Sequence, residues 1–152
     1  MIKFFSNKII FLVIYFSLFQ YSEAQETRFF NKLDSSHRQH TAKSAFDEIE
    51  NGISAGRATS LSSYLSSQTY LSLSNGINGY YSSNQAYYIL EDFFKLYRVI
   101  TFKLQSIRAD EISPYAIGTY NFDYRGKRGT ARVFVSLTKS GNNWKISQLT
   151  IN

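Results

Sequence analysis

The pattern of apolar and polar positions predicts an amphipathic helix that begins after Thr41 and ends at Gly56. Threonine is a common N-terminal helix cap, and glycine often follows the last turn of a helix. Asp47 and Glu48 fall on the polar side. The apolar stripe recurs at steps of three and four residues and consists of Ala42, Ala45, Phe46, Ile49, Gly52 and Ile53. One face of this helix is therefore expected to be buried while the other faces water.

A longer amphipathic helix is predicted from Ser82 onward. Gln85 follows Ser82 by three residues, which is the spacing of a capping box. Tyr87 lies at the border of the expected apolar arc, and Tyr88 lies on the polar side. The arc contains Ala86, Ile89, Leu90, Phe93, Phe94, Leu96 and Tyr97. Most rings of this aromatic stretch are therefore expected to pack in the core.

Between these two helices the sequence predicts a short helix and a β-hairpin. The short helix carries Leu61, Tyr64 and Leu65. Residues 68–74 alternate in the manner of a strand, and residues 75–79 supply asparagine and glycine, which tolerate positive φ in a tight turn.

The second half of the chain predicts four strands with short connections. The expected strands are residues 99–107, 115–124, 130–138 and 144–151. The connections between the last three are short and contain glycine, which favours antiparallel pairing of neighbours. We expect Tyr124 to lie opposite Ala131 and Asp123 to lie opposite Arg132.

The apolar side of this expected sheet must be covered by the helices, because nothing else in the chain can bury it. Ile100, Phe102 and Leu104 are expected on that side. In the last strand, the alternation places Trp144 and its apolar neighbours on one side of the sheet, but it places the later apolar residues on the other side. We therefore expect a bulge near residues 147–148. The predicted fold class is α+β, with about three N-terminal helices packed on a strongly curved antiparallel sheet.

The start of the chain has the layout of a secretory signal. Lys3 and Lys8 precede an apolar run of about 11 residues, whereas a permanent span needs roughly 20. A retained anchor is the alternative. We expect a signal peptide at 1–24, a polar N-terminal arm at 25–41 and a single domain at 42–152. Such a chain would be exported to the periplasm or the cell exterior, would have no membrane span after cleavage and, lacking cysteine, would not be a lipoprotein.

Composition narrows the chemistry of the expected domain. The chain has no cysteine and a formal net charge of +6. The basic excess favours anionic partners, but no continuous stripe of Lys and Arg indicates nucleic-acid binding. The two histidines, His37 and His40, fall in the expected arm, so a serine or cysteine nucleophile with a histidine base is not expected in the domain. No metal site and no cofactor are expected.

The order of helix, short helix, hairpin, long helix and curved meander resembles the nuclear-transport-factor-2-like cone. The segments AFDEIENGISAGRATSLSSYLS, GYYSSNQAYYILEDFF, YAIGTY and WKISQLTI are similar to a small exported family of Bacteroidota, called domain of unknown function 4783. The resemblance covers roughly residues 42–151. It implies the fold but carries no catalytic residues, because the family has no established activity. The wider superfamily implies a pocket between helices and concave sheet, and dimers formed through the sheet.

We expect a non-catalytic exported domain that binds a small apolar or amphipathic ligand, or a protein partner, in a concave pocket. The side chains of tyrosine and tryptophan combine an apolar ring surface with a hydroxyl or indole N–H group that can form hydrogen bonds. The expected pocket-lining residues are Tyr64, Tyr87, Tyr120, Phe122 and Trp144. A dry core filled by the same five rings is the alternative.

Two further functions stay open at this point. A carboxylate-dependent enzyme, of the isomerase, hydrolase or dehydratase type, would place a carboxylate inside the cone beside tyrosine hydroxyls. A ligand-free dimer module would instead use Tyr115, Ile117 and Phe134, which are large apolar residues on the otherwise polar side of the sheet and could form a homodimer surface.

Overall fold

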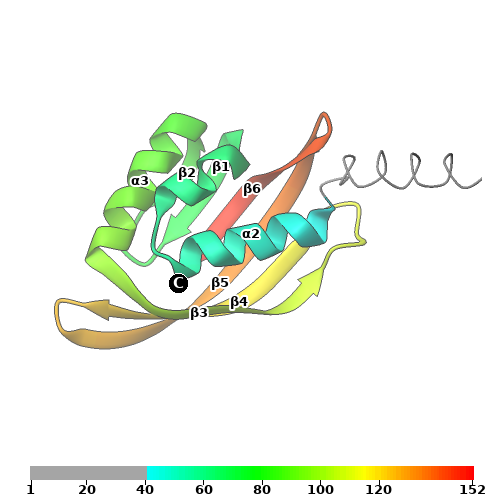
Figure 1. The fold of residues 1–152 in the computed structure, drawn as a ribbon. Helices are drawn as coiled ribbons and strands as arrows, with labels where there is room; N and C mark the ends of the chain where they lie inside the picture. Colours follow the sequence, from blue (N-terminus) through cyan, green and yellow to red (C-terminus); the bar gives the residue numbers. More distant parts are fainter. Residues whose placement is uncertain (1–40) are drawn as a thin grey trace, which may run out of the picture. The chain divides into compact units, whose positions relative to one another are not determined.

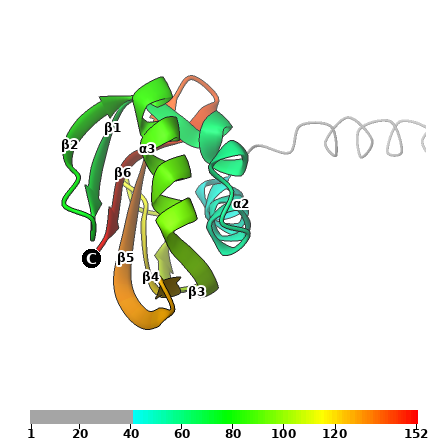
Figure 2. The ribbon, with the colours of Figure 1, turned by 90° about the vertical axis from the view of Figure 1, so that its left-hand side faces the viewer.

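In the computed structural model, the described residues 41–152 form one six-stranded sheet with helices on one of its faces (Figures 1 and 2). The helices are α2 (Ala42–Ser54), the 3-10 helix η1 (Ala58–Tyr64) and α3 (Ser83–Leu96). The strands are β1 (Leu65–Leu73), β2 (Asn78–Ser82), β3 (Tyr97–Arg108), β4 (Tyr115–Tyr124), β5 (Lys127–Ser140) and β6 (Asn143–Ile151). The expected signal peptide, most of the expected arm and both histidines lie in residues 1–40, outside the described residues.

The strands are arranged in the order β2-β1-β6-β5-β4-β3. The predicted antiparallel meander from β3 to β6 and the predicted β1–β2 hairpin are confirmed. One pairing differs from the expected antiparallel sheet, because β1 lies parallel to β6. The strand β2 lies at one edge and β3 at the other, so α3 carries the chain across the sheet between them. The meander from β3 to β6 then leads back across the sheet, and its last strand, β6, pairs with β1 in parallel.

Both predicted helix starts are confirmed by their caps. The Thr41 side chain accepts a hydrogen bond from the Ser44 N–H, and Ser82 with Gln85 forms the full capping box. Gly56, which has a φ of +62°, follows the end of α2. Leu96 was expected in the buried arc but is 45% exposed, because it is the last residue of α3, just before the chain turns into β3.

The predicted register between β4 and β5 is wrong. Tyr124 lies opposite Lys127, not Ala131. The connection is a two-residue turn in which Arg125 and Gly126 have φ values of 52° and 81°, so the strands close immediately after Tyr124. The displacement is an even number of residues, and each side chain therefore keeps the sheet face that the sequence predicted.

Asp123 consequently has a different partner from the expected Arg132. Its carboxylate lies 3.3 Å from the Arg98 guanidinium on β3, and the Gly126 N–H donates to it at 3.0 Å. The Gly126 N–H, followed by Arg98, lowers the pKa of Asp123 from its ordinary value. Arg128 of β5 is its cross-strand neighbour.

Bulges bend the sheet in two of its strands. In β6 the register shifts at Ser147, which confirms the bulge expected at residues 147–148. In β3 the register shifts between Val99 and Thr101, so Ile100 leaves the apolar face and is 46% exposed, contrary to expectation. Phe102 and Leu104 are buried as predicted.

Gly118 permits a close approach of β4 to β3 where the register of β3 shifts a second time, between Leu104 and Ser106. A side chain here would place its Cβ atom 2.4 Å from the carbonyl oxygen of Lys103 on the neighbouring strand. Because that oxygen belongs to the backbone, it could move only if the strand itself were displaced. Only glycine therefore fits at this position. The close pairing of β4 with β3 at this point therefore depends on Gly118.

Candidate functional site

The concave interior is a packed aromatic core in which Tyr120 is fully buried. Its ring centroid lies 6.2 to 6.4 Å from those of Phe93, Phe94 and Phe102. Its hydroxyl donates to the backbone carbonyl of Tyr97, and burial raises the pKa of the phenol. Tyr120 is thus placed as a core residue with a satisfied hydroxyl, as the dry-core alternative describes.

Phe122 is half-buried and fills the space over Gly129, its partner on β5. A Cβ atom at Gly129 would lie 2.5 Å from the Phe122 ring. The ring also packs edge-on against Tyr97, with centroids 5.2 Å apart. Phe122 therefore packs against the hydrophobic core.

A cleft lies where η1 meets the β5–β6 turn, and it brings together Tyr64 and Trp144, which are distant in sequence. Its volume is about 220 Å³. The lining consists of Ala45, Ser63, Tyr64, Asn143, Trp144 and Lys145. Two of the five expected pocket residues thus share one depression.

Helix α2 and the paired strands position the groups of this cleft. Ala45 belongs to the buried face of α2 and lines the cleft together with Tyr64. Lys145 of β6 donates to the Ser63 carbonyl and ties η1 to the sheet. The ammonium group of Lys139 lies 5.9 Å from the Trp144 ring centroid, within range of a cation–π contact.

The electrostatics of the cleft favour a neutral Tyr64 hydroxyl. Partial burial, and secondarily the charge of Glu48, raise the pKa of this phenol. The cleft therefore offers two aromatic walls, a neutral hydroxyl, the Asn143 amide and the Lys145 ammonium group. This set can hold an apolar or amphipathic group by ring contacts and hydrogen bonds.

The sequence did not indicate Ser63, Asn143, Lys145 or Ala45 as lining residues. Three of these four flank the expected rings in sequence, so proximity to Tyr64 and Trp144 was the available signal. Tyr87 is not brought into the cleft. It is half-buried on α3, with its ring edge-on to Tyr88 at 5.1 Å.

On the helix-free face, Tyr115 and Phe134 stack with centroids 5.8 Å apart, and Ile117 is the cross-strand partner of Phe134. All three expected dimer residues are half-buried and lie together. Further along this face, Tyr70 and Tyr80 form an edge-to-face pair at 5.1 Å that the sequence did not indicate.

Comparison with known proteins decides the family. The model of a family described as "Domain of unknown function (DUF4783)" matches residues 46–152. The chain belongs to the DUF4783 family. No curated protein matches the sequence.

Solved structures similar to this DUF4783 protein share its fold. A DUF4783 family protein from Bacteroides uniformis has a TM-score of 0.63 at 21% identity, covering 70% of this chain and 94% of the other. A designed protein described as NTF2 with a long sheet has a TM-score of 0.59 at 15% identity, covering 74% and 100%. A de novo designed protein with a curved β-sheet has a TM-score of 0.56 at 16% identity, covering 73% and 98%. The predicted cone fold is confirmed.

No carboxylate among residues 41–152 of the DUF4783 domain is fully buried, and the least exposed of those in ion pairs are Glu50 and Asp123, with side chains 16% and 23% exposed. In residues 41–152 the only buried polar side chain is Thr69, whose hydroxyl donates to the Ile146 carbonyl. Within the same residues, no three His, Cys, Asp or Glu side chains gather as a metal site, and no helix is long and apolar enough to cross a membrane.

Proposed function

We propose that this DUF4783 protein is an exported, non-catalytic binding domain that holds an apolar or amphipathic group in the Tyr64–Trp144 cleft. The single observation that carries the proposal is the meeting of these two rings across a cleft of about 220 Å³. Pockets for drug-sized ligands have volumes of about 300–1,000 Å³. The cleft suits something smaller, such as one ring or a short chain of a ligand, or one side chain of a protein partner.

The placement of the carboxylates weighs against the enzymatic alternative. That function needs a carboxylate beside tyrosine hydroxyls inside the cone, as general acid or base. The hydroxyl of Tyr120 inside the cone is already bonded to the Tyr97 carbonyl. Glu50, which has a side chain only 16% exposed, is bonded to Lys103 and to the Leu104 N–H. A binding role therefore uses the described groups better than an acid–base role does.

Fluorescence tests the proposal directly, because Trp144 is the only tryptophan of the chain. The purified protein is titrated with 4-methylphenol and, separately, with hexanoate, and the tryptophan emission is recorded. We expect a saturable change with at least one probe. Replacing Tyr64 removes one of the two aromatic walls, so Tyr64→Ala should weaken binding by about tenfold.

Tyr88→Ala is the matched control, since Tyr88 is 56% exposed on α3 and does not line the cleft. Its affinity for either probe should equal that of the unchanged protein. Emission that never saturates, or equal affinities in the Tyr64→Ala and Tyr88→Ala variants, would contradict the proposal.

The stacked Tyr115 and Phe134 favour a second candidate function, a homodimer formed through the helix-free face. Half-buried apolar side chains that gather on an otherwise polar face are typical of interfaces. We expect the purified protein to have twice the mass of one chain at tens of micromolar, and Phe134→Ser to halve that mass. A monomer at the same concentration would eliminate the dimer.

A further inference from the structure

The charges of the domain are divided between its two layers. Helices α2 and α3 carry five carboxylates (Asp47, Glu48, Glu50, Glu91 and Asp92) and two lysines (Lys43 and Lys95). The strands carry one carboxylate, Asp123, and eight basic side chains: Arg98, Lys103, Arg108, Lys127, Arg128, Arg132, Lys139 and Lys145. The sheet layer is therefore strongly basic beneath an acidic helix layer.

Much of this positive charge lies unneutralised on the helix-free face. Asp123 is paired with Arg98, and the only other carboxylate of residues 41–152 that forms an ion pair with β3 is Glu50, which is paired with Lys103. Arg108, Arg128 and Arg132 have no carboxylate within 4.0 Å among residues 41–152. Their guanidinium groups are available to an anionic partner.

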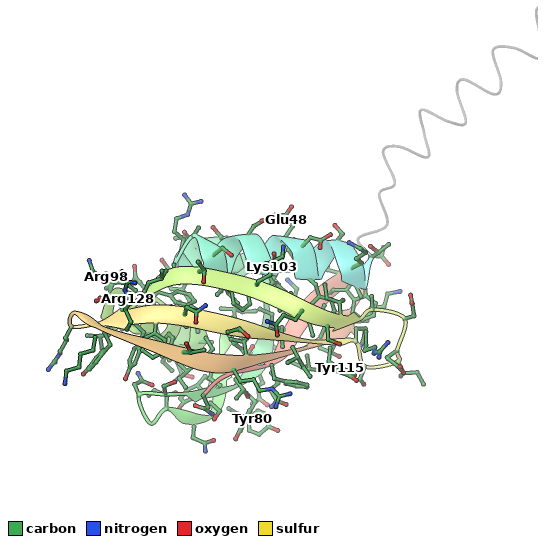
Figure 3. All side chains as sticks on the ribbon, turned by 90° about the horizontal axis from the view of Figure 1, so that it is seen from below. Glu48, Tyr80, Arg98, Lys103, Tyr115 and Arg128 are labelled. Carbon is green, nitrogen blue, oxygen red and sulfur yellow. The ribbon has the colours of Figure 1, made fainter. Side chains whose placement is uncertain are left out.

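Strand pairing fixes how these cations are spaced. Arg132 of β5 and Lys103 of β3 both flank Thr119 of β4, so their Cα atoms lie about 10 Å apart, or two strand spacings. Arg128 and Arg98 flank Asp123 in the same way, near the tip of the β4–β5 hairpin (Figure 3). Two pairs of cations therefore lie across the same three strands.

Neutral hydrogen-bonding groups lie between these two cation pairs. The Asn121 amide donates to the Thr101 hydroxyl and accepts from the Thr130 hydroxyl, both at 2.8 Å. These three side chains belong to β3, β4 and β5 and form one continuous polar row. A polymer crossing the face would meet charged and neutral polar groups in alternation.

Aromatic rings continue the same face away from the hairpin tip. Tyr115 is the cross-strand neighbour of Arg108 on β3. Tyr80 is 73% exposed on β2 and is held edge-on by Tyr70. Tyr115 and Tyr80 lie away from the end that carries Arg128 (Figure 3). Sugar rings present C–H groups that pack on the electron-rich faces of such side chains.

We propose that the helix-free face binds an acidic polysaccharide. Arg128 and Arg132 contact its anionic groups, while the Tyr70–Tyr80 pair packs against its sugar rings. The positions of the rings favour this occupant over two other anionic ones. Successive bases of a nucleic acid stack on several free ring faces, whereas Tyr115 is stacked on Phe134 and Tyr80 is the one largely exposed ring that residues 41–152 place on this face. A bilayer surface is met by a cluster of inserted apolar side chains, whereas exposed Leu96, Ile100 and Ile112 belong to three separate segments.

The experiment measures binding of the purified protein to a fluorescein-labelled alginate oligosaccharide by anisotropy at low salt. Dextran of equal length, a single-stranded thymidine oligonucleotide and phosphatidylglycerol vesicles are the competitors. We expect alginate to bind, to bind more tightly than each competitor, and to dissociate as salt is added. The double variant Arg128→Gln, Arg132→Gln should lose about tenfold or more in affinity, since two charge-assisted contacts are removed.

The control variant, Lys43→Gln with Arg57→Gln, removes the same charge from α2 and the start of η1. Its affinity for alginate should stay within about twofold, because exposed charges elsewhere act only through the screened net field. An equal loss in both double variants would overturn the proposed face. The proposal also fails if alginate does not bind, if dextran binds equally well, or if the oligonucleotide or the vesicles bind more tightly.

Discussion

The Tyr120 side chain contributes both an apolar ring to the hydrophobic core and a hydroxyl that forms a hydrogen bond with the backbone. The ring packs among the phenylalanines of α3 and β3, and the hydroxyl donates to the carbonyl of Tyr97, where α3 gives way to β3. Because the hydroxyl is satisfied internally, the ring can be fully buried without an orphaned polar atom. A phenolate at this place would lose its hydration, which is why the pKa is raised.

Tyr120→Phe should lower the free energy of unfolding by about 1–2 kcal/mol at neutral pH, because the Tyr97 carbonyl loses its donor. The pKa of Tyr120 is raised in the folded state, so its contribution is complete below the unfolded value near 10 and is lost as the pH rises above it. The unchanged protein should therefore lose stability above pH 10 more steeply than the variant.

Urea unfolding at pH 8 and pH 11 measures both effects of that substitution. Tyr80→Phe is the control, since the Tyr80 side chain is 73% exposed and its removal should change neither value. If Tyr120→Phe and the unchanged protein lose the same stability between the two pH values, the buried hydroxyl does not set the alkaline limit.

At the scale of elements, α2 closes the open edge of the sheet. The edge strand β3 would otherwise present free backbone groups that can pair with another chain. The Glu50 carboxylate accepts from the Leu104 N–H at 3.0 Å, and the Ser54 hydroxyl donates to the Phe102 carbonyl at 3.2 Å. Two side chains of one helix thus replace the missing strand along part of this edge.

Glu50→Ala should lower the free energy of unfolding by about 1–3 kcal/mol, because the Leu104 N–H loses its acceptor. Hydrogen exchange at the Leu104 amide should accelerate in the same variant. Lys103→Ala removes only the exposed partner of the ion pair, so it should lower the free energy of unfolding much less than Glu50→Ala does. Equal effects of the two substitutions would show that the ion pair, and not the capped edge, supplies the stability.

Local signals predicted the elements well, whereas contacts set by turn geometry were harder to predict. The caps at Thr41 and Ser82 and the bulge at Ser147 follow from neighbouring residues, and the structure confirms them. The β4–β5 register depends on Arg125 adopting a positive φ, which nothing in its residue type signals. The pairing of β1 with β6 likewise joins segments distant in sequence.

The same distinction applies to the candidate cleft. The sequence indicated Tyr64 and Trp144 as pocket-lining residues because large rings that carry a hydrogen-bonding group often line pockets. It could not separate them from Tyr120, because the depth of each ring depends on how far the sheet curves. The structure places Tyr120 in the core and leaves the other two at the cleft.

At the scale of the whole domain, residues 41–152, the proposed binding sites lie at the surface. The rings of α3, β3 and β4 occupy the concave side, so the proposed cleft lies at the rim, between η1 and the β5–β6 turn. The helix-free face, with its separate aromatic and basic parts, lies on the opposite side of the sheet. The cleft and the proposed polysaccharide face can therefore be occupied at the same time, whereas a dimer formed through Tyr115 and Phe134 would cover part of that face.

The most direct test of the filled interior and the open rim is an NMR titration of the labelled protein with 4-methylphenol. The account predicts chemical-shift changes at Tyr64, Trp144 and Lys145, which line the cleft, and unchanged ring resonances of Tyr120. Changes centred on Tyr120 and Phe122, with the Trp144 indole unaffected, would show that ligand enters the cone itself and would contradict the account.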